Sequence, residues 1–112
     1  MKFTYNKLDK TLELMIVEEI DHHSARKIRD RADYEIQKYM PKTFIIDFSK
    51  VSFMDSAGIG MLIGRYKTVS MFGGKTYMKN VNRSIKKVFE MSGVLKIIPI
   101  IEGGTKIEQC IW

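Results

Sequence analysis

Alternation of apolar and polar residues marks the first strands of this chain. Residues 11–17 read Thr-Leu-Glu-Leu-Met-Ile-Val, which predicts a half-buried strand. A weaker alternation over residues 2–8 predicts a partner strand, and Asp9-Lys10 between the two fits a two-residue hairpin turn. The continuous apolar run over residues 43–48 is typical of a central strand covered on both faces. Two shorter runs predict strands over residues 75–79 and 97–101.

Longer stretches carry apolar residues at helical spacing. The first helix is predicted to start at Ser24, a favourable N-cap residue, and to close at Pro41. Its apolar stripe is Ala25, Ile28, Ala32, Ile36 and Tyr39. The second helix opens at Asp55 and ends at Gly73-Gly74. Its predicted inner face is Ile59, Leu62, Ile63, Tyr66 and Val69.

A third helix is predicted between Asn82, as its N-cap, and Ser92-Gly93. Its inner face would be Ile85, Val88 and Phe89. After it, Ile107, Cys110 and Ile111 would form one apolar helical stripe within residues 105–112. A strand hairpin followed by alternating helices and strands favours an α/β sandwich with helices on the sheet. No repeat or linker divides the chain, so we expect residues 1–112 to form one domain.

Composition narrows the class of protein. The chain has 112 residues, 45% of them hydrophobic, so it needs no disulfide or metal to hold a core. Its one cysteine, Cys110, excludes an internal disulfide and a Cys-rich zinc site. No apolar run approaches the ~20 residues of a membrane span, and no signal peptide opens the chain. We therefore expect a cytoplasmic protein that makes no direct contact with membranes.

The net charge of +6 raises the question of nucleic-acid binding. Five basic residues cluster in and around the predicted third helix: Lys75, Lys79, Arg83, Lys86 and Lys87. Nucleic-acid recognition would also need interleaved aromatic residues, and only Tyr77 and Phe89 are near. Because Phe89 belongs to the apolar stripe, a solvated helix face is the better interpretation, and we expect no nucleic-acid partner.

Several catalytic motifs fail on their spacing. Gly74-Lys75-Thr76 resembles the end of a phosphate-binding loop, but Val69 stands where that loop needs glycine. Gly58 and Gly60 begin a dinucleotide fingerprint that lacks its third glycine. Neighbouring His22 and His23 form a poor metal site without further ligands, so we expect neither a metal nor a cofactor.

Ser56 is the remaining candidate for chemistry. It lies at the predicted start of the second helix, where backbone N–H groups are unpaired and the helix dipole is positive. Phosphorylation would add about −1.5 to −2 charges there, next to Asp55. An acidic partner surface would then be repelled, which would make an on/off switch. The simpler alternative is that Asp55 or Ser56 is only an N-cap and that the nearby glycines permit tight packing.

Three segments resemble the anti-sigma factor antagonists of the STAS-domain family. Residues 53–67 read Phe-Met-Asp-Ser-Ala-Gly-Ile-Gly-Met-Leu-Ile-Gly-Arg-Tyr-Lys and carry the strongest similarity. Residues 19–25, with Asp21-His22-His23, and residues 88–98, with Ser92-Gly93, resemble that family's first loop and third helix. The similarity runs from about Phe3 to Ile101, and its details are most like the stage II sporulation branch.

This resemblance implies both a fold and a function. The fold would be a STAS-type α/β sandwich, a mixed sheet with helices packed mainly on one face. The protein would not be an enzyme but the substrate of one: the anti-sigma factor, an ATP-dependent serine kinase, would phosphorylate Ser56. Unphosphorylated protein would bind that kinase and release the sigma factor, and a PP2C-type phosphatase would restore the unphosphorylated form. We expect a monomer when free.

The family's site residues carry over to particular positions. Ser56 matches the phosphoacceptor, and Asp21 matches an acid in the loop that faces the kinase, although it could equally be a helix-entry acid. The full set implied for partner binding is Asp21, Asp55, Ser56, Ala57, Gly58 and Ile59. Ala57 replaces a second serine that is common in the family, which leaves Ser56 as the only acceptor in the motif. Arg65 and Lys67 are expected to be solvated or snorkelling side chains.

Two alternatives remain open at this stage. A STAS-like domain could serve as a sensor or scaffold that binds a nucleotide or another small ligand. Ser56 could also be an enzyme's nucleophile, which would require a histidine such as His22 or His23 within reach as a base.

Overall fold

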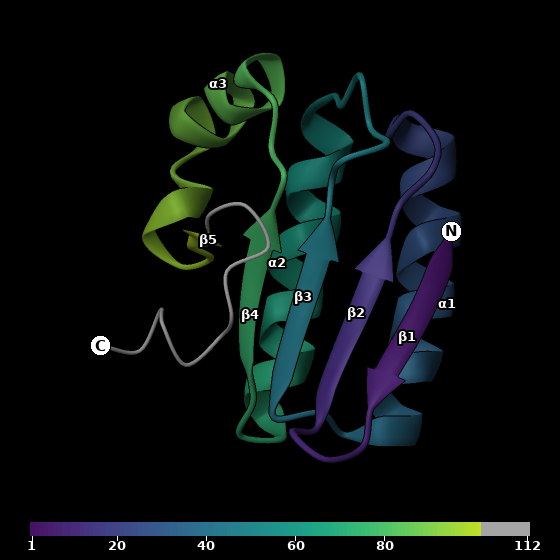
Figure 1. Cartoon of the computed structure of the whole chain (residues 1–112). Coiled ribbons are helices and arrows are strands. Elements are labelled where there is room, and N and C mark those ends of the chain that lie inside the picture. Colours follow the sequence, from purple (N-terminus) through teal and green to yellow (C-terminus); the bar gives the residue numbers. More distant parts are fainter. Residues whose placement is uncertain (102–112) are drawn as a thin grey trace.

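A mixed five-stranded sheet forms the centre of the protein. The computed structural model describes residues 1–101, and its strands lie in the order β1-β2-β3-β4-β5 (Figure 1). β1 (Lys2–Asn6) pairs antiparallel with β2 (Thr11–Met15). β3 (Thr43–Asp47), β4 (Lys75–Lys79) and β5 (Ile100–Ile101) all run parallel to β2. The hairpin-then-alternation pattern of the sequence therefore predicted the sheet correctly.

Two long helices cover one face of this sheet. α1 (His22–Tyr39) and α2 (Ser56–Met71) lie side by side behind the strands in Figure 1. α3 (Arg83–Ser92) follows β4, and a short 3₁₀ turn, η1 (Val94–Lys96), leads toward β5. Each parallel pair of strands needs such a crossover connection, which explains the strand–helix alternation.

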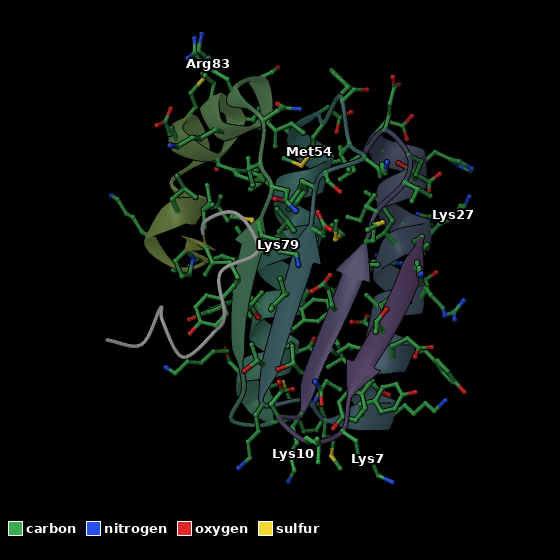
Figure 2. All side chains as sticks on the ribbon, viewed as in Figure 1. Lys7, Lys10, Lys27, Met54, Lys79 and Arg83 are labelled. Carbon is green, nitrogen blue, oxygen red and sulfur yellow. The ribbon has the colours of Figure 1, made fainter. Side chains whose placement is uncertain are left out.

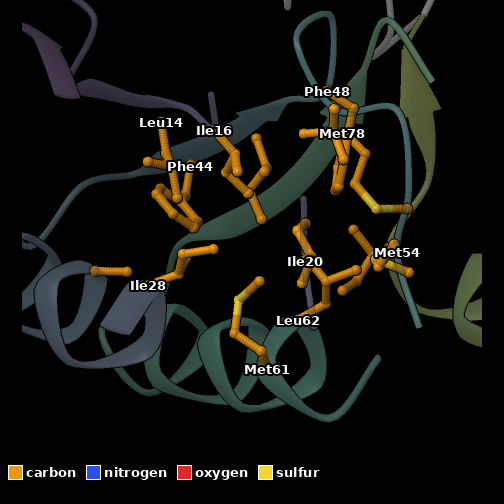
Figure 3. Close-up of a cluster of buried hydrophobic side chains, with 14 of the residues drawn as sticks. Leu14, Ile16, Ile20, Ile28, Phe44, Phe48, Met54, Met61, Leu62 and Met78 are labelled. Atoms are coloured by element: carbon orange, nitrogen blue, oxygen red, sulfur yellow. The ribbon is translucent and has the colours of Figure 1, made fainter. Parts of the chain in front are cut away.

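The hydrophobic core lies between the sheet and the two long helices. Leu14, Ile46 and Met78 are aligned across β2, β3 and β4, and all three are buried. Figure 3 shows these strands' side chains pointing toward Ile28 of α1 and toward α2, from which Met61 and Leu62 extend. Burying one such side chain contributes roughly 1.5–3 kcal/mol, so this layer fixes how α1 and α2 sit on the sheet.

The opposite face of β3 is also buried, as the apolar run over residues 43–48 predicted. No helix among the described residues lies on this face. An ion pair of 2.9 Å joins Lys79 Nζ on β4 to Glu13 Oε1 on β2 and so spans β3. Ile45 and Asp47, which point to this face, are nevertheless buried. The continuous apolar run thus predicted burial on both faces of β3 correctly.

Two connections differ from the predicted ones. The hairpin loop has four residues, 7–10, rather than two, since Asn6 pairs with Thr11. The Asn6 side chain accepts a hydrogen bond of 2.9 Å from the Leu8 backbone N–H, and Lys10 takes a left-handed φ of 55°.

The last strand is also shorter than the predicted 97–101. The segment before β5 begins with the 3₁₀ turn η1, which is not extended and cannot pair with β4. Pro99 has no N–H to donate, so it bonds β4 only through its carbonyl, which accepts from Met78 N at 3.0 Å. The predicted stripe of Ile107, Cys110 and Ile111 lies outside the described residues.

The helices confirm most of the predicted faces, with one shift in α2. In α1 and α3 the predicted apolar residues are buried or partly buried. In α2, Leu62 and Val69 are buried as predicted, whereas Ile59, Ile63 and Tyr66 are only partly buried. Buried in their place are Gly58, Met61 and Arg65. α2 packs on α1 as well as on the sheet, so its buried arc extends toward α1.

Candidate functional site

The starts of α1 and α2 meet at one end of the molecule. The Ile20 backbone N–H donates to the Phe53 carbonyl, and the Asp55 N–H donates to the Ile20 carbonyl, both at 2.9 Å. These bonds form an isolated parallel bridge between Ile20 and Met54. The loops involved run along the top of the molecule in Figure 1, and Met54 is labelled at the same end in Figure 2. The two loops that the sequence singled out are therefore neighbours.

Asp21 is the N-cap of α1, in place of the predicted Ser24. Its Oδ1 accepts from the Ser24 backbone N–H at 2.8 Å, and Ser24 Oγ accepts from the Asp21 N–H at 3.0 Å. Ser24 Oγ also donates to the Glu19 carbonyl at 2.7 Å. Asp and Ser both suit an N-cap position. Because the two residues bond each other's backbone N–H reciprocally, Asp21 is the N-cap and Ser24 is the third helical residue of a capping box. The helix consequently begins at His22, two residues before Ser24.

This capping also sets the charge at the start of α1. The hydrogen bond from the Ser24 backbone lowers the pKa of the Asp21 carboxyl below its ordinary value. Asp21 is exposed, so a charged carboxylate is presented to solvent at this end of the molecule.

Asp55, one of the two N-cap candidates from the sequence, caps α2 in the same way. Its Oδ1 accepts from the Ala57 backbone N–H at 2.9 Å. Ser56 is then the first residue of the helix, and it is exposed. Within residues 1–101 the Ser56 hydroxyl makes no hydrogen bond, so it is accessible to a reagent or an enzyme.

The three residues after Ser56 differ in their access to solvent. Ala57 and Ile59 are partly buried, whereas Gly58 is buried. A Cβ at Gly58 would meet Met54 Cγ and Sδ at 2.5 Å and Ile20 Cγ2 at 3.1 Å. Gly58 thus allows α2 to pack closely on the Ile20–Met54 bridge. Of the six predicted binding residues, Asp21, Asp55 and Ser56 share a surface, and Gly58 lies beneath it.

Exposed apolar side chains near this surface were missed by the sequence analysis. Phe53, which pairs with the loop before α1, is 50% exposed, and Val17, just after β2, is 53% exposed. Neither stands out in the hydrophobic pattern, because an apolar residue in a loop is expected to be partly buried. Exposed aromatic and aliphatic side chains beside a charged rim are common in protein interfaces.

A groove between α1 and α2 was also missed. It has a volume of about 300 Å³ and is lined by His22 and Arg26 of α1 and by Ala57 and Gly60 of α2, among others. No sequence pattern indicates this groove, since it depends on how the two helices pack.

Arg65, on the inner wall of this groove, is not the solvated side chain that was predicted. Its side chain is only 7% exposed, and its Nε lies 2.8 Å from Asp33 Oδ1 of α1. Burial lowers the pKa of the Arg65 guanidinium, and the Asp33 carboxylate opposes that shift. Lys67 is exposed, as predicted.

The alternative roles for Ser56 and the histidines can be compared with the geometry of the described residues. No hydrogen bond joins Ser56 to His22 or His23 within residues 1–101, so the contact that activates a serine nucleophile is not formed. In the same part of the chain, no group of three or more His, Cys, Asp or Glu is placed to hold a metal ion. None of the described helices is both long enough and apolar enough to cross a membrane.

Comparisons with known proteins agree with this geometry. The model of the STAS domain matches residues 2–105. An anti-sigma F factor antagonist of Paenibacillus polymyxa is 34% identical over 84 residues, covering 75% of this chain and 72% of that protein. The anti-sigma factor antagonist SpoIIAA in its unphosphorylated form has a TM-score of 0.76 and 28% identity, covering 98% of this chain and 93% of its own. The Bacillus cell fate determinant SpoIIAA in the phosphorylated form has a TM-score of 0.67 and 28% identity, covering 98% of this chain and 96% of its own. The predicted fold class, a mixed sheet with helices mainly on one face, is confirmed by this likeness.

Proposed function

Because the chain belongs to the STAS domain family, we propose that it is an anti-sigma factor antagonist switched by phosphorylation of Ser56. Its unphosphorylated form binds an anti-sigma factor that is a serine kinase, and the sigma factor is thereby released. One observation supports this proposal above the others: the Ile20–Met54 bridge brings the Asp21 cap and the exposed Ser56 onto the same surface. Relatives in both unphosphorylated and phosphorylated forms support a modification of this kind.

The binding surface in this proposal is the end of the molecule around Ser56. Asp21 and Asp55 present carboxylates, Ala57 and Ile59 form the first turn of α2, and Phe53 adds exposed apolar area. Gly58 contributes indirectly, by letting α2 pack against Met54. Unphosphorylated Ser56 is small and uncharged, so a partner surface can approach the helix start closely.

Phosphate on Ser56 stops this docking through charge and bulk. It adds about −1.5 to −2 charges at Ser56, directly beside the Asp55 carboxylate that accepts from the Ala57 N–H. The added charge therefore lies next to an acidic side chain and faces the partner. No change of fold is required, since Ser56 is exposed at the surface.

The catalytic parts of the cycle belong to other proteins. ATP and Mg²⁺ bind to the kinase, and a PP2C-type phosphatase removes the phosphate. The antagonist itself is a cytoplasmic, monomeric, single-domain protein that supplies the acceptor hydroxyl and the docking surface. The similarity to the SpoIIAA proteins favours a role in sporulation.

Intact-mass spectrometry with peptide mapping tests this proposal. The protein is incubated with the anti-sigma factor, ATP and Mg²⁺, and Ser56→Ala serves as the control variant. We expect one added phosphate, mapped to Ser56 and absent from the variant. A kinase that phosphorylates another antagonist but leaves this protein unmodified would contradict the proposal. That result would favour the alternative, a STAS module that senses a nucleotide or another small ligand.

A further inference from the structure

The groove between α1 and α2 is lined by basic side chains at its sides and by small residues at its base. Its α1 wall carries His22, Arg26 and Arg29, and Arg65 stands on the α2 side. Ala57 and Gly60 of α2 leave the space between them open, and nothing lies within 4 Å of a Cβ built on Gly60. The volume of about 300 Å³ is enough for one or two side chains rather than a folded segment.

One cation of this groove, Arg26, has no acidic partner among residues 1–101. Arg29 Nη2 lies 3.1 Å from Asp30 Oδ1, and Arg65 Nε lies 2.8 Å from Asp33 Oδ1. Arg26 forms no ion pair with any residue in 1–101. Asp30 and Asp33 thus offset the charges of Arg29 and Arg65, respectively. The positive charge of Arg26 remains to attract an anionic ligand into the groove.

Arg65 provides a second, independent sign of a ligand. Its side chain is 93% buried, because only 7% is exposed, and its Nη1 has no hydrogen-bond partner within the described part of the chain. Buried guanidinium N–H groups are nearly always bonded, and leaving one without a partner is unfavourable. Nη1 has less than 1 Å² of exposed surface, so a small rotation of the Arg65 side chain, which lines the groove, would bring Nη1 to an anionic oxygen seated there.

We propose that this groove receives one carboxylate side chain of the antagonist's protein partner, held by Arg26 and Arg65. The proposal rests on the proposed function, in which that partner is the anti-sigma factor. It adds the chemistry of the contact: the partner's docking segment presents a Glu or Asp to the space above Gly60.

A carboxylate fits this groove better than a phosphate does. A single uncompensated cation matches a monoanion, whereas a phosphate dianion would remain half unneutralised. At each helix start one backbone N–H that could bind a phosphate already donates to an acidic cap, Ser24 N–H to Asp21 and Ala57 N–H to Asp55. The Ala57–Gly60 floor suits the aliphatic stem of an acidic side chain.

The groove also explains why Ser56 is an effective position for a switch. Gly60 lies four residues after Ser56, one turn along the same helix face, and Ala57 is its neighbour. Phosphate on Ser56 would place its charge at the entrance of the groove, where it would outweigh the single positive charge of Arg26. The partner's carboxylate would then be repelled from its own site.

Affinity measurements by calorimetry test the proposal with the unphosphorylated protein and the anti-sigma factor. Arg26→Gln removes the positive charge of Arg26, and Gly60→Gln places a side chain in the groove from a position where a Cβ has nothing within 4 Å. Gly64→Gln is the matched control, because a Cβ there also has nothing within 4 Å and Gly64 is not among the groove residues. We expect about tenfold weaker binding or more for the first two variants and parental binding for the control. Parental affinity in Arg26→Gln and Gly60→Gln would overturn the proposal and leave the proposed function standing.

A peptide titration separates this proposal from the function on which it rests. Hexaglutamate is added to ¹⁵N-labelled protein at constant ionic strength, with hexaserine and inorganic phosphate as comparison probes. We expect hexaglutamate to shift the amide signals of Ala57 and Gly60, and Arg26→Gln to abolish the shifts. Equal shifts with hexaserine, or larger ones with phosphate, would overturn the carboxylate assignment whether or not the anti-sigma factor binds. If hexaglutamate shifts the groove but the parent protein does not bind the anti-sigma factor, the failure belongs to the proposed function.

Discussion

At the scale of single residues, polar side chains at the ends of strands and helices fix the loops around the site. Asp47, the last residue of β3, is buried, and its Oδ1 accepts from the Ser49 backbone N–H at 2.8 Å and from Asn80 Nδ2 at 3.0 Å. Burial alone would raise the pKa of the Asp47 carboxyl. The hydrogen bonds from Asn80 and Ser49, together with the charge of Lys79, outweigh burial and lower that pKa below its ordinary value of 3.8.

This shift makes a pH-dependent prediction for Asp47→Asn. A carboxyl whose pKa is lower in the folded state stabilises the fold above its unfolded pKa, and this contribution is lost as pH falls through the folded value. We expect the variant to lose about 1–2 kcal/mol of unfolding free energy at neutral pH, since hydrogen bonds to a charged group are weakened. Urea unfolding at pH 7 and below about pH 4 measures the difference in unfolding free energy between the parent and Asp47→Asn. This difference should become smaller in acid, where the Asp47 carboxyl is protonated in the parent. An equal loss at both pH values would contradict this explanation.

Residue-scale features were only partly visible in the sequence. The sequence left the cap of α2 open between Asp55 and Ser56, because both directly precede the helical pattern, and the structure selects Asp55. The assignment of Ser24 as the cap of α1 was wrong, since several polar residues precede that helix and each is a plausible first cap. Only the reciprocal bonds between Asp21 and Ser24 decide between them.

At the scale of elements, a buried ion pair joins α1 to α2. The Asp33 side chain is 32% exposed, whereas that of Arg65 is 7% exposed. If the pair is broken, water can therefore hydrate Asp33 better than it can hydrate Arg65. We expect Asp33→Ala to lower the unfolding free energy by about 2 kcal/mol, because it leaves a buried charge without its partner. Arg65→Met should lower the unfolding free energy by about half as much or less, since the Asp33 carboxylate that remains is partly hydrated. Urea unfolding of both variants tests this order, and a larger loss for Arg65→Met would reverse it.

Two glycines near the start of α2 have opposite environments. A Cβ at Gly58 would meet Met54 at 2.5 Å, whereas one at Gly60 meets nothing within 4 Å. Gly60→Ala should stabilise the protein by up to about 1 kcal/mol through helix propensity. Gly58→Ala gains the same propensity but overpacks the Ile20–Met54 bridge, so we expect a net loss of about 1 kcal/mol. Thermal unfolding of the pair measures the difference, and equal shifts in Tm would show that Gly58 has no packing role.

Periodicity predicted these elements better than their contacts. The strands and helices of residues 2–92 were found from alternation and helical spacing, because those patterns record which face is buried. The inner face of α2 was partly wrong, since a helix that packs on both a sheet and another helix buries a wider arc. Arg65 was missed for the same reason: a charged residue is assumed to be exposed unless its partner, here Asp33 of another helix, is known.

At the scale of the whole molecule, the parallel connections place the starts of α1 and α2 at the same end of the sheet. The loops after β2 and β3 both emerge there, and the Ile20–Met54 bridge joins them (Figure 1). The resemblance to a family pointed to Asp21 and Ser56 separately. Their closeness, and the groove beside them, follow from strand order and helix packing, which no local pattern in the sequence records.

Calorimetry of anti-sigma factor binding, with and without phosphate on Ser56, tests the central claim most directly. Like charges brought together in an interface cost several kcal/mol, so we expect the phosphorylated protein to bind at least roughly 100-fold more weakly than the unphosphorylated one. Ser56→Ala should bind like the unphosphorylated protein, and Ser56→Asp should fall between the two, because it carries a single charge. Equal affinities for the phosphorylated and unphosphorylated proteins would contradict the account of Ser56 as a charge-operated switch.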